Sequence, residues 1–161
     1  MNLISQILPV SRVIVDVAVK DKFVVFEQAA RMFEAQHGLS AKTINNALTQ
    51  REKLGSTGLG QGIAIPHGRI KGLKESLGAF FRTAEPIPFD APDGKPVNLI
   101  FVMLVPEQAN ESHLRLLSEL AQMFSDRTFR EDVSAAPDGA RILQLFSEWN
   151  PNAANERRAA L

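Results

Sequence analysis

His67 is the residue with the clearest chemical potential, because it closes a segment, residues 56–69, that is rich in glycine and holds a single proline. Pro66 fixes the backbone just before His67, so the imidazole leaves the chain in a defined direction. The neighbouring residues are small and are expected to leave one side of the ring open to a partner: Gly62, Ala64 and Gly68. Neutral imidazole is a competent nucleophile near neutral pH. We therefore predict that His67 is a covalent acceptor.

The other histidines do not suggest a metal or cofactor site. The three histidines lie far apart in the sequence and lack a His-x-x-x-His spacing, so no metal ion is expected. Residues 58–62 lack the spacing of a dinucleotide loop, and no Gly-x-Ser-x-Gly of a serine hydrolase occurs. His37 precedes Gly38 and is assigned no chemistry, since a partly protonated imidazole suits a helix C-terminus.

Helices and strands alternate around this segment. Spacing of apolar residues predicts helices over residues 3–8, 23–37, 40–51, 112–124 and 140–149, and strands over residues 12–17, 77–83 and 99–105. The helix that begins at Ser40 brings Arg51 in its last turn toward the His67 loop. These elements alone predict an α/β or α+β layered domain with a mixed sheet.

Two stretches carry a family resemblance. Residues 51–58 (Arg-Glu-Lys-Leu-Gly-Ser-Thr-Gly) and residues 60–68 (Gly-Gln-Gly-Ile-Ala-Ile-Pro-His-Gly) resemble the phosphorylation-site signature of a phosphotransferase system (PTS) IIA domain. The system depends on phosphoenolpyruvate, and the class is that of mannitol, fructose and nitrogen-regulatory IIA domains. The resemblance implies a small mixed β-sheet flanked by helices on both faces. We expect one domain over residues 1–150 and a mobile tail over residues 151–161.

The resemblance also implies roles for three side chains. His67 would accept the phosphoryl group, His113 would be a neutral hydrogen-bonding stabiliser, and Arg51 would bind phosphoryl oxygens together with backbone N–H groups near Gly68. A helix N-terminus disfavours imidazolium, so His113 is expected to stay neutral. Taken without the resemblance, His113 is better explained by exposure or packing, and Arg51 by a solvated helix end.

The phosphoryl donor implied by the resemblance is an HPr-like phosphocarrier protein. An apolar rim around His67 is expected to dock it, with contributions from aliphatic residues of the same region: Leu59, Ile63, Ile70 and Leu73. For each of these residues, and for Ile63 most of all, core packing is the competing interpretation.

Three functions stay open. Gly58 stands where sugar-specific relatives tend to place an aromatic residue, and neither a IIB-type cysteine nor a membrane segment follows, which favours a nitrogen-regulatory phosphocarrier. A fructose- or mannitol-type IIA that passes phosphate to a separate IIB protein is the first alternative, and a noncatalytic protein-binding module is the second. Gln61 occupies a position that is commonly asparagine in the family.

Composition limits the remaining classes. The 161 residues include 18 Lys plus Arg, 18 Asp plus Glu and no cysteine, so nonspecific nucleic-acid binding is disfavoured and disulfides are excluded. The start of the chain lacks a signal peptide pattern, and no apolar run reaches membrane-spanning length. We expect a cytoplasmic protein without membrane insertion.

Overall fold

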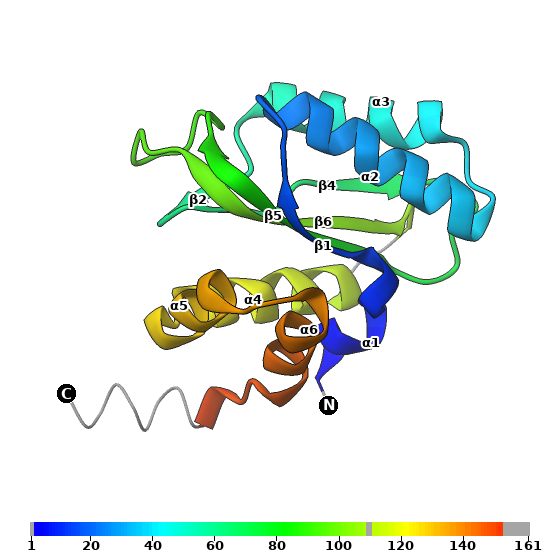
Figure 1. The fold of residues 1–161 in the computed structure, drawn as a ribbon. Coiled ribbons are helices and arrows are strands. Elements are labelled where there is room, and N and C mark those ends of the chain that lie inside the picture. Colours follow the sequence, from blue (N-terminus) through cyan, green and yellow to red (C-terminus); the bar gives the residue numbers. More distant parts are fainter. Residues whose placement is uncertain (1, 109–110, 153–161) are drawn as a thin grey trace.

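A single mixed sheet lies between two layers of helices in the computed structural model, which describes residues 2–108 and 111–152 (Figure 1). One face of the sheet is covered by α2 (Lys22–His37) and α3 (Ala41–Leu54). The other face carries α1 (Leu3–Ile7), α4 (Glu111–Ser125), α5 (Arg127–Ala135) and α6 (Gly139–Glu148). This arrangement confirms the predicted fold class. No helix in these described ranges is both long and apolar enough to span a bilayer.

The sheet is built around two long antiparallel strands, β5 (Leu77–Ile87) and β6 (Val97–Pro106). β1 (Val13–Val17) adds to β5 in parallel. On the far side of β6 lie two short strands, β3 (Ile63–Ala64) and β4 (His67–Ile70), which follow one another and both run parallel to β6. β2 (Gly58–Gly60) pairs antiparallel with β3 and completes this edge.

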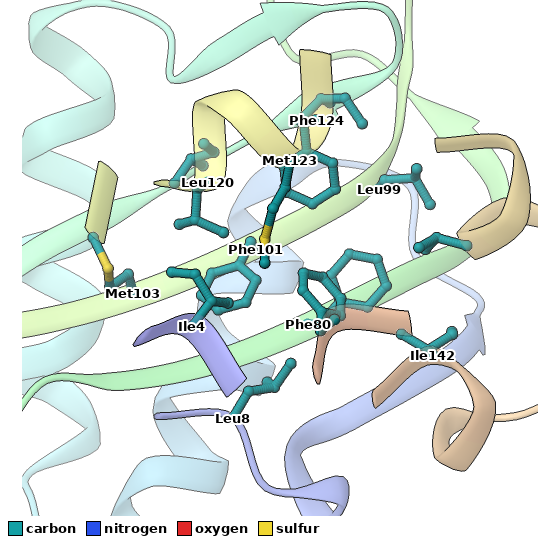
Figure 2. Packing of buried hydrophobic residues seen from close by; sticks show 14 of the residues in the cluster. Ile4, Leu8, Phe80, Leu99, Phe101, Met103, Leu120, Met123, Phe124 and Ile142 are labelled. Atoms are coloured by element: carbon teal, nitrogen blue, oxygen red, sulfur yellow. The ribbon is translucent and has the colours of Figure 1, made fainter. Parts of the chain in front are cut away.

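Both faces of β6 are buried, so alternate side chains feed two separate cores. Leu99, Phe101 and Met103 pack against α1, α4 and α6 together with residues such as Ile4, Leu120 and Phe124 (Figure 2). Ile100, Val102 and Leu104 face the other way and pack against α2 and α3. The uninterrupted apolar run of this strand is what a sheet covered on both faces requires.

Local signals set the helix boundaries. Side chains of Asp21 and Ser40 accept backbone N–H bonds at the starts of α2 and α3, and Gly38 ends α2 in the left-handed conformation with a φ of 69°. The predicted helices and central strands are confirmed, although β5 continues to Ile87, beyond the predicted end of this strand at residue 83. α5 was not predicted, and its nine residues bury only Phe129 and Val133.

Arg12 lies outside the strand that was predicted to begin with it. It lies in a 3-10 turn, residues 10–12, rather than in the predicted strand, and its guanidinium is buried. It donates to the carbonyls of Ile7 and Gly78 and to the Gln36 side chain, and it lies 3.0 Å from Nε2 of His37. Because the guanidinium can only donate, the ring nitrogen of His37 is the acceptor in this contact.

The division into a domain of residues 1–150 and a mobile tail stays a prediction. Of that tail, residues 153–161 lie outside the described residues.

Candidate active site

His67 is the first residue of β4, which follows β3 after a break of two residues. β3 ends at Ala64, the chain passes through Ile65 and Pro66, and β4 begins at His67, paired with Met103 of β6. The Pro66 carbonyl accepts the Met103 N–H at 2.9 Å, which keeps the interrupted segment against β6. Paired residues point to the same face of a sheet, and Met103 belongs to the core beneath α4. The imidazole is therefore on the α4 side.

One hydrogen bond defines the chemistry of the His67 ring. Nδ1 lies 2.9 Å from the Ile65 carbonyl oxygen, two residues earlier in the chain. Since a carbonyl can only accept, Nδ1 carries the proton and Nε2 is the basic nitrogen of the neutral ring. The side chain is half-buried. The group that fixes the tautomer is thus the backbone carbonyl of Ile65, which lies in the apolar run that precedes the histidine.

The second histidine comes from the helix layer on the same face. His113 is the third residue of α4, and its ring centroid lies 5.6 Å from that of His67 with a tilt of 57° between the planes. Only 8% of His113 is exposed. Its buried Nδ1 has no hydrogen-bond partner among the residues that the structure describes. The two imidazoles therefore form a contacting pair.

Arg51 reaches the site from the opposite layer, around the edge of the sheet. It lies in the last turn of α3, and its guanidinium donates to the Gly55 carbonyl at 2.8 Å. α3 can approach β4 because Gly68 has no side chain: a Cβ there would lie 3.1 Å from the Cβ of Ala47. Gly68 therefore serves helix packing. Gly68 also lines the open hollow that His67 borders, so its role in ring access stays a prediction.

Gly62 and Ala64 also serve packing rather than ring access. Ala64 is fully buried in the core beneath α2 and α3. Gly62 has a φ of 79°, and a Cβ there would lie 2.9 Å from the side-chain oxygen of Asn98. A left-handed backbone and a close neighbour both favour glycine at this position.

His67, His113 and Arg51 line one open hollow of about 620 Å³. The other lining residues come from α3 and β4: Ala47, Gln50, Leu54, Gly68 and Arg69. Arg69 was missed by the sequence analysis, although alternation along a strand from His67 would have indicated that it shares a face with the histidine. The hollow thus combines two imidazoles with two guanidinium groups.

Burial and positive charge keep both histidines neutral. Burial lowers the pKa of His67 below its ordinary value; Arg51 and Arg69 lower it further, whereas the bond to Ile65 and the charge of Glu52 act in the opposite direction. The pKa of His113 is also lowered, first by burial and then by His67 and Arg69. Desolvation is therefore the main cause at His113, where the sequence argument had relied on the helix N-terminus.

The predicted apolar rim is largely wrong. Ile63 and Ile70 are core residues, 1% and 3% exposed, and Leu73 packs against the core beneath α2 and α3. Leu59 is exposed but borders a different hollow, with Ala121 and Arg130. The exposed leucine that lines the hollow is instead Leu54. In the described parts of the chain, no three acidic or histidine side chains gather as a metal ion would require.

A neutral, oriented imidazole beside guanidinium groups at the edge of a three-layer α/β sandwich defines a protein suited to carry an anionic group on histidine. Residues 6–149 match the family model described as "Phosphoenolpyruvate-dependent sugar phosphotransferase system, EIIA 2", and the chain belongs to this family. It is therefore a member of a family of phosphotransferase components.

Individual relatives agree with this assignment. The chain is 42% identical over 143 residues to the nitrogen regulatory protein of Pseudomonas aeruginosa, covering 88% of this chain and 93% of that protein. It is similar to the crystal structure of the nitrogen regulatory protein IIA-Ntr from Neisseria meningitidis, with 49% identity, a TM-score of 0.85 and coverage of 89% of this chain and 99% of that one. The mannitol IIA of Escherichia coli shares the fold at 20% identity and a TM-score of 0.71, with 85% and 96% of the two chains covered.

Proposed function

We propose that this protein is a nitrogen-regulatory phosphocarrier of the cytoplasm. An HPr-like protein presents a phosphohistidine, Nε2 of His67 attacks the phosphorus, the donor's N–P bond breaks and a new N–P bond forms, while Nδ1 keeps its proton. The presence or absence of the phosphoryl group then changes the binding of regulatory target proteins.

The bond from Nδ1 to the Ile65 carbonyl is the observation that carries the proposal. It leaves Nε2 unprotonated and fixes the plane of the ring, which are the two conditions for nucleophilic attack. The lowered pKa of His67 keeps the nucleophile available at neutral pH. Arg51 supplies a guanidinium that can bind two oxygens of the transferring group, and a neutral His113 can donate a hydrogen bond.

Packing around Gly58 supports the nitrogen-regulatory branch. A Cβ at Gly58 would lie 2.9 Å from the Cβ of Ala91, so the loop that contains Ala91 occupies the space an aromatic side chain would need. The similarity to two nitrogen regulatory proteins points the same way. Transfer to a separate IIB protein remains the alternative that the test below must exclude.

Intact-mass and phosphopeptide analysis tests the proposal. The protein is incubated with phosphoenolpyruvate, enzyme I and an HPr-type carrier, and it is handled without acid because the N–P bond is labile. We expect one phosphoryl group on His67, none in His67→Ala, and slower labelling of Arg51→Lys, whose ammonium cannot form two parallel bonds. Absence of labelling with several competent donors would instead favour the protein-binding module.

A second step separates the two carrier functions. The phosphorylated protein is mixed with fructose- and mannitol-type IIB proteins, and loss of its phosphoryl group is followed by mass. Retention of the group supports the regulatory function, whereas rapid transfer to a IIB cysteine would establish the sugar branch.

A further inference from the structure

Glu52 is a buried carboxylate one residue away from Arg51. It is 4% exposed and lies in the last turn of α3. Oε2 accepts from Nζ of Lys22 on α2 at 3.0 Å, and Lys22 is itself only 8% exposed. Asp90 contributes a second, exposed carboxylate at 3.3 Å from the same Nζ. Burying a charge is costly unless it is paired, so this pair fixes α2 against the end of α3.

The same carboxylate also holds the segment that follows α3. Oε1 accepts a short hydrogen bond from the Thr57 hydroxyl, and Oε2 accepts the Thr57 backbone N–H at 3.0 Å. Thr57 is 5% exposed. Glu52 therefore accepts hydrogen bonds both from α2 and from the segment that follows α3, and it holds these two parts of the chain together.

Thr57 is connected to the His67 ring through two further hydrogen bonds. Its carbonyl accepts the backbone N–H of Ile65 at 3.0 Å. The carbonyl of Ile65 in turn accepts from Nδ1 of His67 at 2.9 Å. Three successive contacts thus lead from the Glu52 carboxylate to the imidazole. The three hydrogen bonds involve separate groups of the chain, so together they fix the position of the His67 ring and do not transfer a proton.

We propose that Glu52 is a positioning residue for phosphoryl transfer: through Thr57 and Ile65 it holds the His67 ring in its Nδ1–H form, and through α3 it holds Arg51 over the same hollow. The proposal rests on the proposed function for its kinetic part. Its geometric part, the state of the His67 ring, stands without any phosphoryl donor.

Glu52→Gln tests the proposal most directly. An amide has one acceptor oxygen and cannot serve Lys22 and Thr57 as the two carboxylate oxygens do. We expect phosphorylation that still maps to His67 but proceeds about ten- to a hundredfold more slowly, because small misplacements of reacting groups cost this much. Nitrogen NMR of the His67 ring should show a smaller Nδ1–H fraction, and its pKa should fall further because the Glu52 charge raises it.

Thr57→Val is the second variant, and it keeps the charge of Glu52. It removes only the hydroxyl bond, so we expect a smaller loss of rate and of the Nδ1–H tautomer, while Thr57→Ser should restore both. If Glu52→Gln fails to fold, this pair still decides the question. Wild-type tautomer and rate in Thr57→Val would then overturn the proposal.

Arg82→Gln is the matched control for lost stability. Arg82 is buried like Glu52, with 8% of it exposed, but it donates to the carbonyls of Val133 and Ala136 on the far helix layer. We expect it to lower stability without changing the His67 tautomer. Equal slowing in Arg82→Gln and Glu52→Gln, or an unchanged ring in Glu52→Gln, would refute positioning. If wild type is not phosphorylated, the proposed function fails while the NMR comparison still tests Glu52.

Discussion

Gly68→Ala tests how closely α3 must approach the acceptor strand. The added Cβ would lie 3.1 Å from the Cβ of Ala47, whereas ordinary contacts begin near 3.4 Å, so α3 must move by a few tenths of an ångström. Overpacking of this kind costs about 1–3 kcal/mol. Because Arg51 lies one turn further along α3, the same movement should also slow phosphorylation of His67.

A double-mutant cycle isolates this contact. Ala47→Gly alone should cost about 1 kcal/mol, the penalty for glycine within a helix. If the two changes were independent, the double variant would lose about 2–4 kcal/mol. Moving the methyl group from α3 to β4 removes the clash, however, and leaves ordinary contacts of 3.4 and 3.5 Å to backbone atoms of Ala47 and Leu48. We therefore expect the double variant to lose only about 1 kcal/mol, the helix penalty alone.

Urea unfolding of wild type, the two single variants and the double variant gives the four free energies of unfolding. The dependence of each free energy on urea concentration is compared, because a changed slope would mean that more than stability had changed. A Gly68→Ala variant as stable as wild type, or a double variant whose losses add, would refute the packing argument. Phosphorylation rates measured on the same proteins should recover in the double variant if helix position is the cause.

Three further predictions concern pH and the glycine-rich segment. Burial lowers the pKa of His67 and His113 below the value of about 6.5 expected in the unfolded chain, so the unfolded state binds more protons. The stabilising contribution of the two neutral rings is therefore full above about pH 6.5 and falls below it. Urea unfolding between about pH 5 and 8 that shows no such fall, or an equal fall in His67→Ala, would contradict this prediction. Gln61→Asn should raise the unfolding free energy by about 0.5–1 kcal/mol, because Gln61 has a φ of 58° and asparagine tolerates the left-handed region better; a lower urea midpoint would count against it. Gly58→Ala should cost about 1–3 kcal/mol through its contact with Ala91, and a neutral effect would show that the loop yields freely.

Much of the fold follows from local signals in the sequence. Ser40 and Gly38 mark helix ends because capping depends on nearby residues, and the apolar run of β6 indicates a strand covered on both faces. By contrast, α5 was missed because two buried residues, Phe129 and Val133, give too weak a pattern in a short helix. The strands of residues 58–70 are too short and too rich in glycine to show an alternation of their own.

The candidate site was only partly predictable for a related reason. His67, His113 and Arg51 could be named from the sequence, and the structure brings them to one hollow. Glu52 could not be given a role, because its partner Lys22 lies 30 residues earlier and only tertiary folding joins them. The packing role of Gly68 could not be predicted, because nothing in the sequence shows that α3 packs there.

The position of the site between two separately packed cores has a consequence for its persistence in solution. His113 is held by the layer of α4, whereas Arg51 is held by the layer of α3, and each layer has its own apolar cluster. Local opening of either layer, at a free energy below that of global unfolding, is enough to separate the groups. With independent opening, the competent fraction is the product of the two closed fractions, so we expect acceptor activity to decline on heating before the loss of secondary structure becomes measurable.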